Sequence, residues 1–234
     1  TPGGIVLGSQ YSGSNTMDGA ISDVYFTNTA RLHTANFTPD TQSSVVSTLT
    51  HAVDWTGSTV ENILGGTNND RLTGNSADNL ITGGTGNDSI TGGTGNDTLS
   101  GGAGNDVYSF AEGDGVDLIT ENDATSGNLD KILFNGSVSQ SEVALFIDGN
   151  GNLQIGNTSA AGDLITVQDY NDGAAYQIER LELSTGQYMT AAEVNQVIAD
   201  MAAYATTNSV SFTSLDDVKN DANLVAIVNG GWHS

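Results

Sequence analysis

Five consecutive nine-residue repeats constrain the fold of this sequence more than any other feature. They span residues 65–109 and read GGTNNDRLT, GNSADNLIT, GGTGNDSIT, GGTGNDTLS and GGAGNDVYS. The sixth position is Asp or Asn in every copy, and the eighth is apolar. A flexible linker rich in Gly and Asp would not place an apolar residue at every ninth position, so the repeats predict an ordered, repetitive fold.

Each repeat combines a glycine turn with a short strand. Paired glycines permit positive φ angles and a close approach of neighbouring carbonyls, because glycine has no Cβ. The strand after the turn points its apolar side chain inward. Two repeats complete one coil, and successive coils stack about 4.8 Å apart through parallel pairing. The pattern therefore predicts an all-β protein with a parallel β-roll over residues 65–120.

Stacking brings the sixth-position residues of alternate coils into two files. We expect Asp70, Asp88 and Asp106 in one file, and Asn79, Asp97 and Asp117 in the other. Carboxylates this close repel by roughly 1 kcal/mol per pair in water, and by more where the dielectric constant falls. A cation must lie between them. Ca²⁺ fits best, because it accepts carboxylate and carbonyl oxygens in flexible geometry, whereas Mg²⁺ demands a tighter octahedron.

The nonapeptides resemble those of the repeats-in-toxin (RTX, haemolysin-type calcium-binding) family of secreted bacterial proteins. The resemblance implies that one turn contributes its first and third carbonyls and its Asp. The turn stacked on it contributes its second and fourth carbonyls and its own Asp. Roughly three to five Ca²⁺ ions are implied. The residues that the resemblance implies at these sites are Gly65, Thr67, Asp70, Asn79, Gly83, Gly84, Thr85, Gly86, Asp88, Gly92, Thr94, Asp97, Gly102, Gly104, Asp106, Gly113, Gly115 and Asp117.

Each implied site pairs two turns that lie one coil apart. The pairs are 83–88 with 101–106, which is the best formed, 65–70 with 83–88, and 92–97 with 113–117. The turn 113–117 is degenerate and follows a two-residue insertion around Phe110. The turn at Gly74 departs from the pattern, with Asn75 second, Ala77 fourth and Asn79 sixth, so we expect its site to be weak or empty.

Composition narrows the possible partners. The chain has 28 acidic and 5 basic residues, for a formal net charge of −23. Nucleic acid and anionic membrane surfaces are therefore excluded as expected partners, because both need Lys and Arg to neutralise phosphate. Cysteine is absent, which excludes disulfides and thiolate metal sites. No apolar run has the length of a transmembrane helix, so no membrane insertion is expected.

The sequence before the repeats has two interpretations. Residues 18–39 resemble the closing strands of laminin-G-like or concanavalin-A-like jelly rolls, so residues 1–40 are expected to be terminal strands of such a region. They would either belong to a glycan-binding domain or cover the start of the roll, which we favour. Residues 41–64 are a transition and N-terminal cap, in which Trp55 either caps the core or stacks on a sugar.

Residues 121–204 are expected to form a β-sandwich-like domain that extends the roll, and they resemble the domain that follows these repeats in haemolysin-type proteins. Alternating apolar residues around the turn 148–151 predict a hairpin. An EF-hand loop needs Gly at its sixth position and Glu at its twelfth, and counted from Asp148 these positions are Leu153 and Ser159, so we favour the turn. Further strands are expected at 131–134, 164–170 and 178–184. A capping box at Thr190 and Glu193 predicts a helix over 191–204.

The tail, residues 205–234, can form a second short helix that Ser214 begins and that runs to about residue 228. The RTX resemblance implies a C-terminal secretion signal here that is read by a type I secretion channel. The alternative is an ordinary amphipathic helix that packs on the sandwich. The chain begins at Thr1 without a Met or a basic, apolar leader, so we expect a fragment of a larger protein.

These features predict a non-catalytic, calcium-dependent folding and export module at the C-terminus of a larger protein. That protein would be secreted, or held at the cell surface, by a Gram-negative bacterium. The alternative is a glycan-binding, adhesin or surface-layer assembly module, carried by Trp55, Trp232 and Tyr25. Scattered histidines and the absence of a nucleophile elbow or zinc helix argue against an enzyme, and any catalytic domain would lie upstream.

The site assignment predicts a difference between two alanine variants. Asp88→Ala removes a carboxylate that serves two stacked sites, whereas Asn79→Ala affects only the turn at Gly74, which departs from the repeat pattern. We expect Asp88→Ala to raise the calcium midpoint of folding more than Asn79→Ala does, in titrations followed by circular dichroism. Equal midpoints would contradict the assignment.

Overall fold

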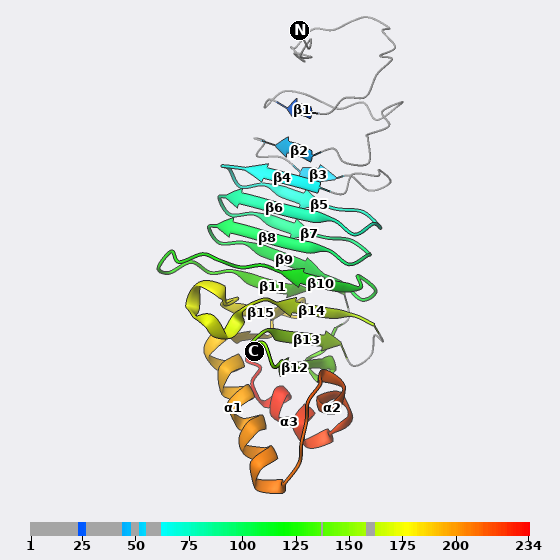
Figure 1. Cartoon of the computed structure of the whole chain (residues 1–234), viewed down its shortest axis with the longest axis vertical. Helices are drawn as coiled ribbons and strands as arrows, with labels where there is room; N and C mark the ends of the chain where they lie inside the picture. Colours follow the sequence, from blue (N-terminus) through cyan, green and yellow to red (C-terminus); the bar gives the residue numbers. More distant parts are fainter. Residues whose placement is uncertain (1–22, 27–43, 48–51, 55–61, 137, 158–161) are drawn as a thin grey trace, which may run out of the picture.

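The computed structural model describes residues 23–26, 44–47, 52–54, 62–136, 138–157 and 162–234. This part of the chain is mostly β, with parallel strands in two sheets and a few short helices (Figure 1). The strands are stacked along the long axis of the molecule, and the helices gather at one end of the stack. Such an arrangement fits the expected combination of a roll with a sandwich-like extension.

The first sheet contains nine of the described strands. In spatial order they are β1 (Asp23–Phe26), β2 (Ser44–Ser47), β4 (Asn62–Gly66), β6 (Leu80–Thr85), β8 (Thr98–Ala103), β10 (Val116–Ile119), β14 (Leu164–Val167), β13 (Leu153–Asn157) and β12 (Val143–Ile147). Pairing is parallel from β1 to β14 and antiparallel from β14 to β12. The sheet therefore begins as a parallel stack and ends as a meander.

The second sheet contains seven of the described strands. In spatial order they are β16 (Tyr188–Thr190), β15 (Arg180–Leu183), β11 (Lys131–Phe134), β9 (Val107–Phe110), β7 (Ser89–Thr91), β5 (Arg71–Thr73) and β3 (Ala52–Asp54). All pairs are parallel except β15 with β16. The chain alternates between the two sheets from β3 to β11, as expected for coils of two strands.

The core lies between the two sheets and follows the eighth position of the repeats. One row from the second sheet consists of Leu72, Ile90, Tyr108, Ile132 and Leu181, which are paired in register and buried. The first sheet contributes Ile63, Ile81, Leu99 and Ile119 in the same way. Removing these side chains from water is the main apolar contribution to stability.

Three α-helices cover the far end of the first sheet: α1 (Ala191–Asn208), α2 (Leu215–Asn220) and α3 (Ala222–Gly230). All three pack against β12 (Figure 1). The expected capping box begins α1, because Glu193 N–H donates to Thr190 Oγ1 and Thr190 N–H donates to Glu193 Oε2. None of the helices in the described part of the chain is long and apolar enough to cross a membrane.

The second expected helix is divided in two at Asp221. This residue ends α2, and its carboxylate accepts the N–H groups of Asn223 and Leu224, so it caps α3. The expected strand 164–170 ends at Val167, because Asp169 has a φ of 55° and Tyr170 begins a 3₁₀ turn. Neither the break at Asp221 nor the end of the strand at Val167 was expected, because the spacing of apolar residues does not mark them.

The other elements agree with expectation. The strand expected at 131–134 is β11, and the strand expected at 178–184 is the shorter β15. The expected hairpin is formed by β12 and β13, and Asp148 Oδ1 accepts the N–H groups of Asn150 and Asn152 in its turn. The carboxylate of Asp148 therefore stabilises the turn.

The predictions before residue 62 lie largely outside the described residues. Trp55 and the side chains of β1 to β3 belong to that undescribed part. Of the backbone, β1 and β2 continue the first sheet by parallel pairing towards β4. The jelly-roll resemblance of this segment stays a prediction.

Candidate calcium sites

The first file of carboxylates forms a ladder of main-chain to side-chain hydrogen bonds. Asp70 N–H donates to Asp88 Oδ1, and Asp88 N–H donates to Asp106 Oδ1, both at 2.7 Å. The ladder goes beyond the repeats, because Asp106 N–H donates to Asp130 Oδ1 at 2.7 Å and Asp130 N–H donates to Glu179 Oε2 at 2.8 Å. One file of acidic side chains thus links five successive turns.

The second file is shorter and also stacks as expected. Asn79 N–H donates to Asp97 Oδ1 at 2.8 Å, and Asp97 N–H donates to Asp117 Oδ1 at 2.9 Å. In the next strand, Ile165 is paired with Asp117. The file therefore ends at Asp117, because no carboxylate follows at the next level.

Several of these carboxylate oxygens are buried without a hydrogen-bond partner. Among the described residues this applies to Oδ2 of Asp70, Asp88, Asp97 and Asp106, and to Oδ1 of Asp70. The four side chains are at most 3% exposed. A buried polar atom without a partner costs on the order of 1 to 3 kcal/mol, and more when it is charged, so such atoms require a ligand.

The electrostatics point to a missing positive charge. Burial raises the pKa of Asp70 and Asp106 to about 6 and that of Asp117 to about 7, and neighbouring carboxylates add to each shift. Burial raises the pKa of Asp130 to about 7 as well. A divalent cation between the coils would remove this penalty and favour the ionised carboxylates.

The first glycine of each turn keeps space open beside the Asp of the same turn. A Cβ on Gly83 would overlap Asp88 Oδ2 and would lie only 2.6 Å from the carbonyl oxygen of Gly101. A Cβ on Gly65 would overlap the Gly83 carbonyl oxygen and lie 2.8 Å from Asp70 Oδ2. The unpartnered oxygens of Asp70 and Asp88 therefore lie beside a carbonyl of the following coil, which is the mixed oxygen chemistry that Ca²⁺ prefers.

The backbone of the well-formed turns also depends on glycine. Gly84 and Gly86, the second and fourth residues of one turn, have φ angles of 115° and 124°. At the departing turn, Asn75 and Ala77 occupy these positions without a positive φ. There Asn79 Oδ1 accepts the Asn75 N–H at 2.8 Å, so this amide oxygen already has a donor inside its own turn. The geometry favours the expectation of a weak or empty site.

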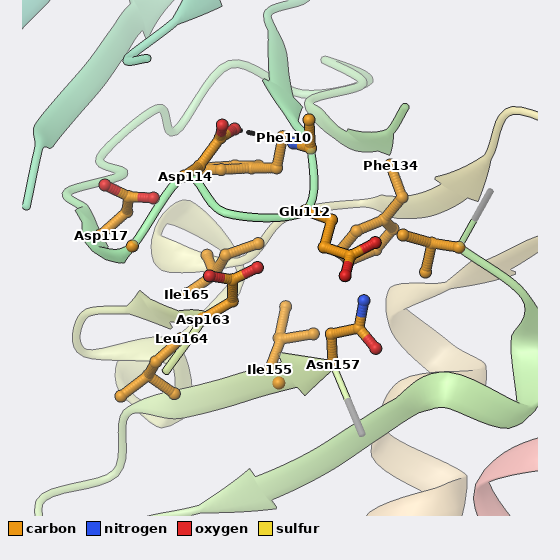
Figure 2. Close-up of a pocket in the computed structure, with 14 residues that line it drawn as sticks. Phe110, Glu112, Asp114, Asp117, Phe134, Ile155, Asn157, Asp163, Leu164 and Ile165 are labelled. Atoms are coloured by element: carbon orange, nitrogen blue, oxygen red, sulfur yellow. Dashed lines mark hydrogen bonds between the residues drawn. The ribbon is translucent and has the colours of Figure 1, made fainter. Parts of the chain in front are cut away.

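The degenerate turn 113–117 borders a small pocket. Figure 2 shows Asp114, Asp117 and Asp163 around it, with Phe110 and Ile155 among the apolar side chains of its wall. One oxygen of Asp114 accepts the Ala111 N–H and one oxygen of Asp163 accepts the Gly113 N–H, each at 2.7 Å. These carboxylates hold the inserted turn in place, and Asp117 Oδ1 remains bonded to the second file.

Carboxylates alone do not complete any of these sites. Within the residues that the structure describes, no group of three or more His, Asp or Glu side chains is arranged to hold a metal ion. An ion would depend on main-chain carbonyls together with the Asp side chains, as the stacked turns provide. The described residues thus fit Ca²⁺ better than metals that prefer nitrogen ligands.

Three acidic residues were not expected from the sequence, namely Asp130, Glu179 and Glu121, and all are buried or partly buried in the first file or beside it. A signal was present for the first two. The tripeptides 130–132 and 179–181 repeat the order of acidic, variable and apolar residue seen in 106–108. An insertion in the turn before residue 130 breaks the nine-residue period, so a search at fixed spacing does not find them.

The crowding at Gly83 predicts a calcium-binding defect. Gly83→Ala would place a methyl group against Asp88 Oδ2, so we expect a calcium midpoint at least several-fold higher. Gly149→Ala is the matched control, because a Cβ there meets nothing within 4 Å. Calcium titrations of both variants by circular dichroism measure the effect. Equal midpoints for Gly83→Ala and Gly149→Ala would contradict the placement of the site.

The raised pKa values predict the pH dependence of the calcium-free fold. The pKa of these carboxyl groups is about 6 to 7 in the folded state, against an ordinary value of 3.8, so the folded state binds their protons more tightly. Their contribution to the free energy of unfolding is complete below pH 3.8. That contribution is lost as the pH rises through about 7. We expect the calcium-free protein to be less resistant to urea at about pH 8 than at about pH 5. The opposite trend would show that these carboxylates are not buried together.

The comparison with known families agrees with this geometry. The family of the RTX calcium-binding nonapeptide repeat (4 copies) matches residues 55–90 and 82–117. No curated protein matches the chain. Repeats of this family bind calcium and are typical of secreted bacterial proteins. The two matched segments, which contain the turns described above, are therefore similar to RTX calcium-binding repeats.

Proposed function

We propose that this chain is a calcium-dependent folding and export module of a larger protein secreted by a type I system. The observation that carries the proposal is the set of buried Asp oxygens without partners between stacked glycine turns. The module itself is non-catalytic, and it acts outside the cell or at the surface of a Gram-negative bacterium. Several Ca²⁺ ions, in the range of roughly three to five, serve as its cofactors.

The mechanism is linkage between ion binding and folding. Extracellular calcium sites have dissociation constants of about 10⁻⁴ to 10⁻³ M, so the sites stay empty at cytosolic calcium concentrations. Outside the cell, each occupied site adds on the order of 1 kcal/mol by mass action. Several sites together shift the balance to the folded state. The chain would then cross its channel unfolded and fold only after export.

The position of the tail supports this order of events. In the folded protein, Leu215 and Val218 of α2 and Leu224 and Val228 of α3 are buried against the rest of the fold. A secretion signal in residues 205–234 would therefore be accessible in the unfolded chain and covered after folding.

No described side chain favours the alternative of a glycan-binding or assembly module. Trp232 packs against the core, and its Nε1 is buried. His233 Nε2 contacts Glu193 Oε1. Tyr25 and Trp55 are among the residues whose side chains the structure does not describe. A polysaccharide pull-down of the calcium-loaded chain tests this second function directly.

The deciding experiment is a calcium titration from chelator to about 10 mM, followed by circular dichroism and size exclusion, with magnesium as the control. We expect a cooperative gain of β-structure and a smaller hydrodynamic radius with calcium alone, because Mg²⁺ retains its waters. A compact fold that is already complete in chelator, or an equal response to magnesium, would contradict the proposal.

A further inference from the structure

One oxygen of the Asp106 carboxylate, Oδ2, is buried without a hydrogen-bond partner at the end of the repeats. The unpartnered oxygens of Asp70 and Asp88 lie beside Gly65 and Gly83, next to carbonyls of the coil that follows each turn. Asp106 Oδ2 lies beside Gly101, because a Cβ there would overlap it, but no carbonyl of a following coil is among the three nearest atoms. Asp106 itself is 0% exposed. Its Oδ1 accepts the Asp88 N–H from the preceding level, so Oδ2 is the oxygen left for the interval between turn 101–106 and the segment that stacks on it.

The segment 121–130 stacks on that turn although it is not a repeat. Thr120 N–H donates to the Leu99 carbonyl at 2.9 Å, which sets Glu121 opposite Gly101, the first position of the turn below. Asp130 then lies one level beyond Asp106, since Asp106 N–H donates to Asp130 Oδ1. These two residues are 24 positions apart, against 18 for Asp88 and Asp106, so the extra residues leave the stacking unchanged.

Glu121 brings a third carboxylate to this interval. Its Oε2 accepts the Tyr108 hydroxyl at 2.7 Å, and the same hydroxyl accepts the Gly101 N–H at 2.5 Å. Glu121 is 2% exposed, and the charges of Asp130 and Asp106 both act on it. In the core row of the second sheet, Tyr108 is paired with Ile90, and its hydroxyl holds Glu121 Oε2 by a hydrogen bond.

The described residues supply no positive charge to this cluster. The nearest basic residues in the file's own strands, Lys131 and Arg180, pair with Glu182 on the outer face of the second sheet. Asp106, Glu121, Asp123 and Asp130 are therefore all buried at this interval, and Asp106 Oδ2 has no donor. Uncompensated buried charge of this size is strongly unfavourable, so a cation is required.

We propose an additional site for a hard divalent cation, with Ca²⁺ as the ligand, between turn 101–106 and segment 121–130. Asp106 and Asp130 bind the ion together with main-chain carbonyls, and Glu121 adds negative charge beside it. The inference rests on the proposed calcium-dependent fold, because it adds a level to the same file. A larger number of carboxylates raises calcium affinity, so this site binds more tightly than the repeat sites.

The direct test counts bound calcium in the folded protein. Native mass spectrometry and equilibrium dialysis would compare the wild type with Glu121→Gln, Asp130→Asn and the control Asp200→Asn, which removes one charge from an exposed position on α1. We expect Asp130→Asn to lose one ion and Glu121→Gln to weaken the tightest ion about tenfold. An unchanged number and affinity in both variants, equal to those of Asp200→Asn, would overturn the site.

A luminescence measurement tests the same cation site if Glu121→Gln or Asp130→Asn fails to fold. Tb³⁺ replaces Ca²⁺ at oxygen sites, and a nearby tyrosine transfers excitation to it. We expect Tyr108→Phe to reduce the emission of the first Tb³⁺ ion bound, and Tyr188→Phe on the outer strand β16 to leave it unchanged. Equal emission from the two variants would overturn the site. A wild type that binds no calcium at all would instead refute the proposed function.

Discussion

The fold depends on carboxylates that are buried in files without a positive charge from the protein. Asp88 and Asp106 each accept the N–H of the preceding level with one oxygen, and the other oxygen lies beside the first glycine of its turn. The hydrophobic row beside the file favours tight stacking of the coils, while the charges oppose it. Packing and repulsion therefore oppose each other along the file, and a bound cation would reduce the repulsion.

The period of the repeats predicts the structure well where the period holds. It gives the alternation of strands between the sheets, the buried row from Leu72 to Tyr108 and the order of both files. It does not give Asp130, because an insertion changes the spacing while the strand register survives. It also misses Glu121, whose burial follows from the hydroxyl of Tyr108 on another strand, and the capping of α3 by Asp221.

Along the stack, the files of carboxylates end and hydrophobic packing continues without them. The second file ends where Ile165 replaces a carboxylate, and from β14 onward the first sheet is antiparallel. There the three helices pack against β12, and apolar side chains of the hairpin and the helices belong to one core. This end of the molecule is thus held by an ordinary hydrophobic core, whereas the repeats hold their coils together around charge.

The insertions in the turns have a consequence for engineering. Two turns are longer than the repeat allows, yet the strands on either side keep their pairing, with Asp97 linked to Asp117 and Asp106 to Asp130. Turn length is therefore independent of strand register in this architecture. Foreign peptides placed at the edge of a coil would be displayed at fixed, closely spaced levels, and under the proposed function the withdrawal of calcium would release the peptides carried by the repeats from this arrangement.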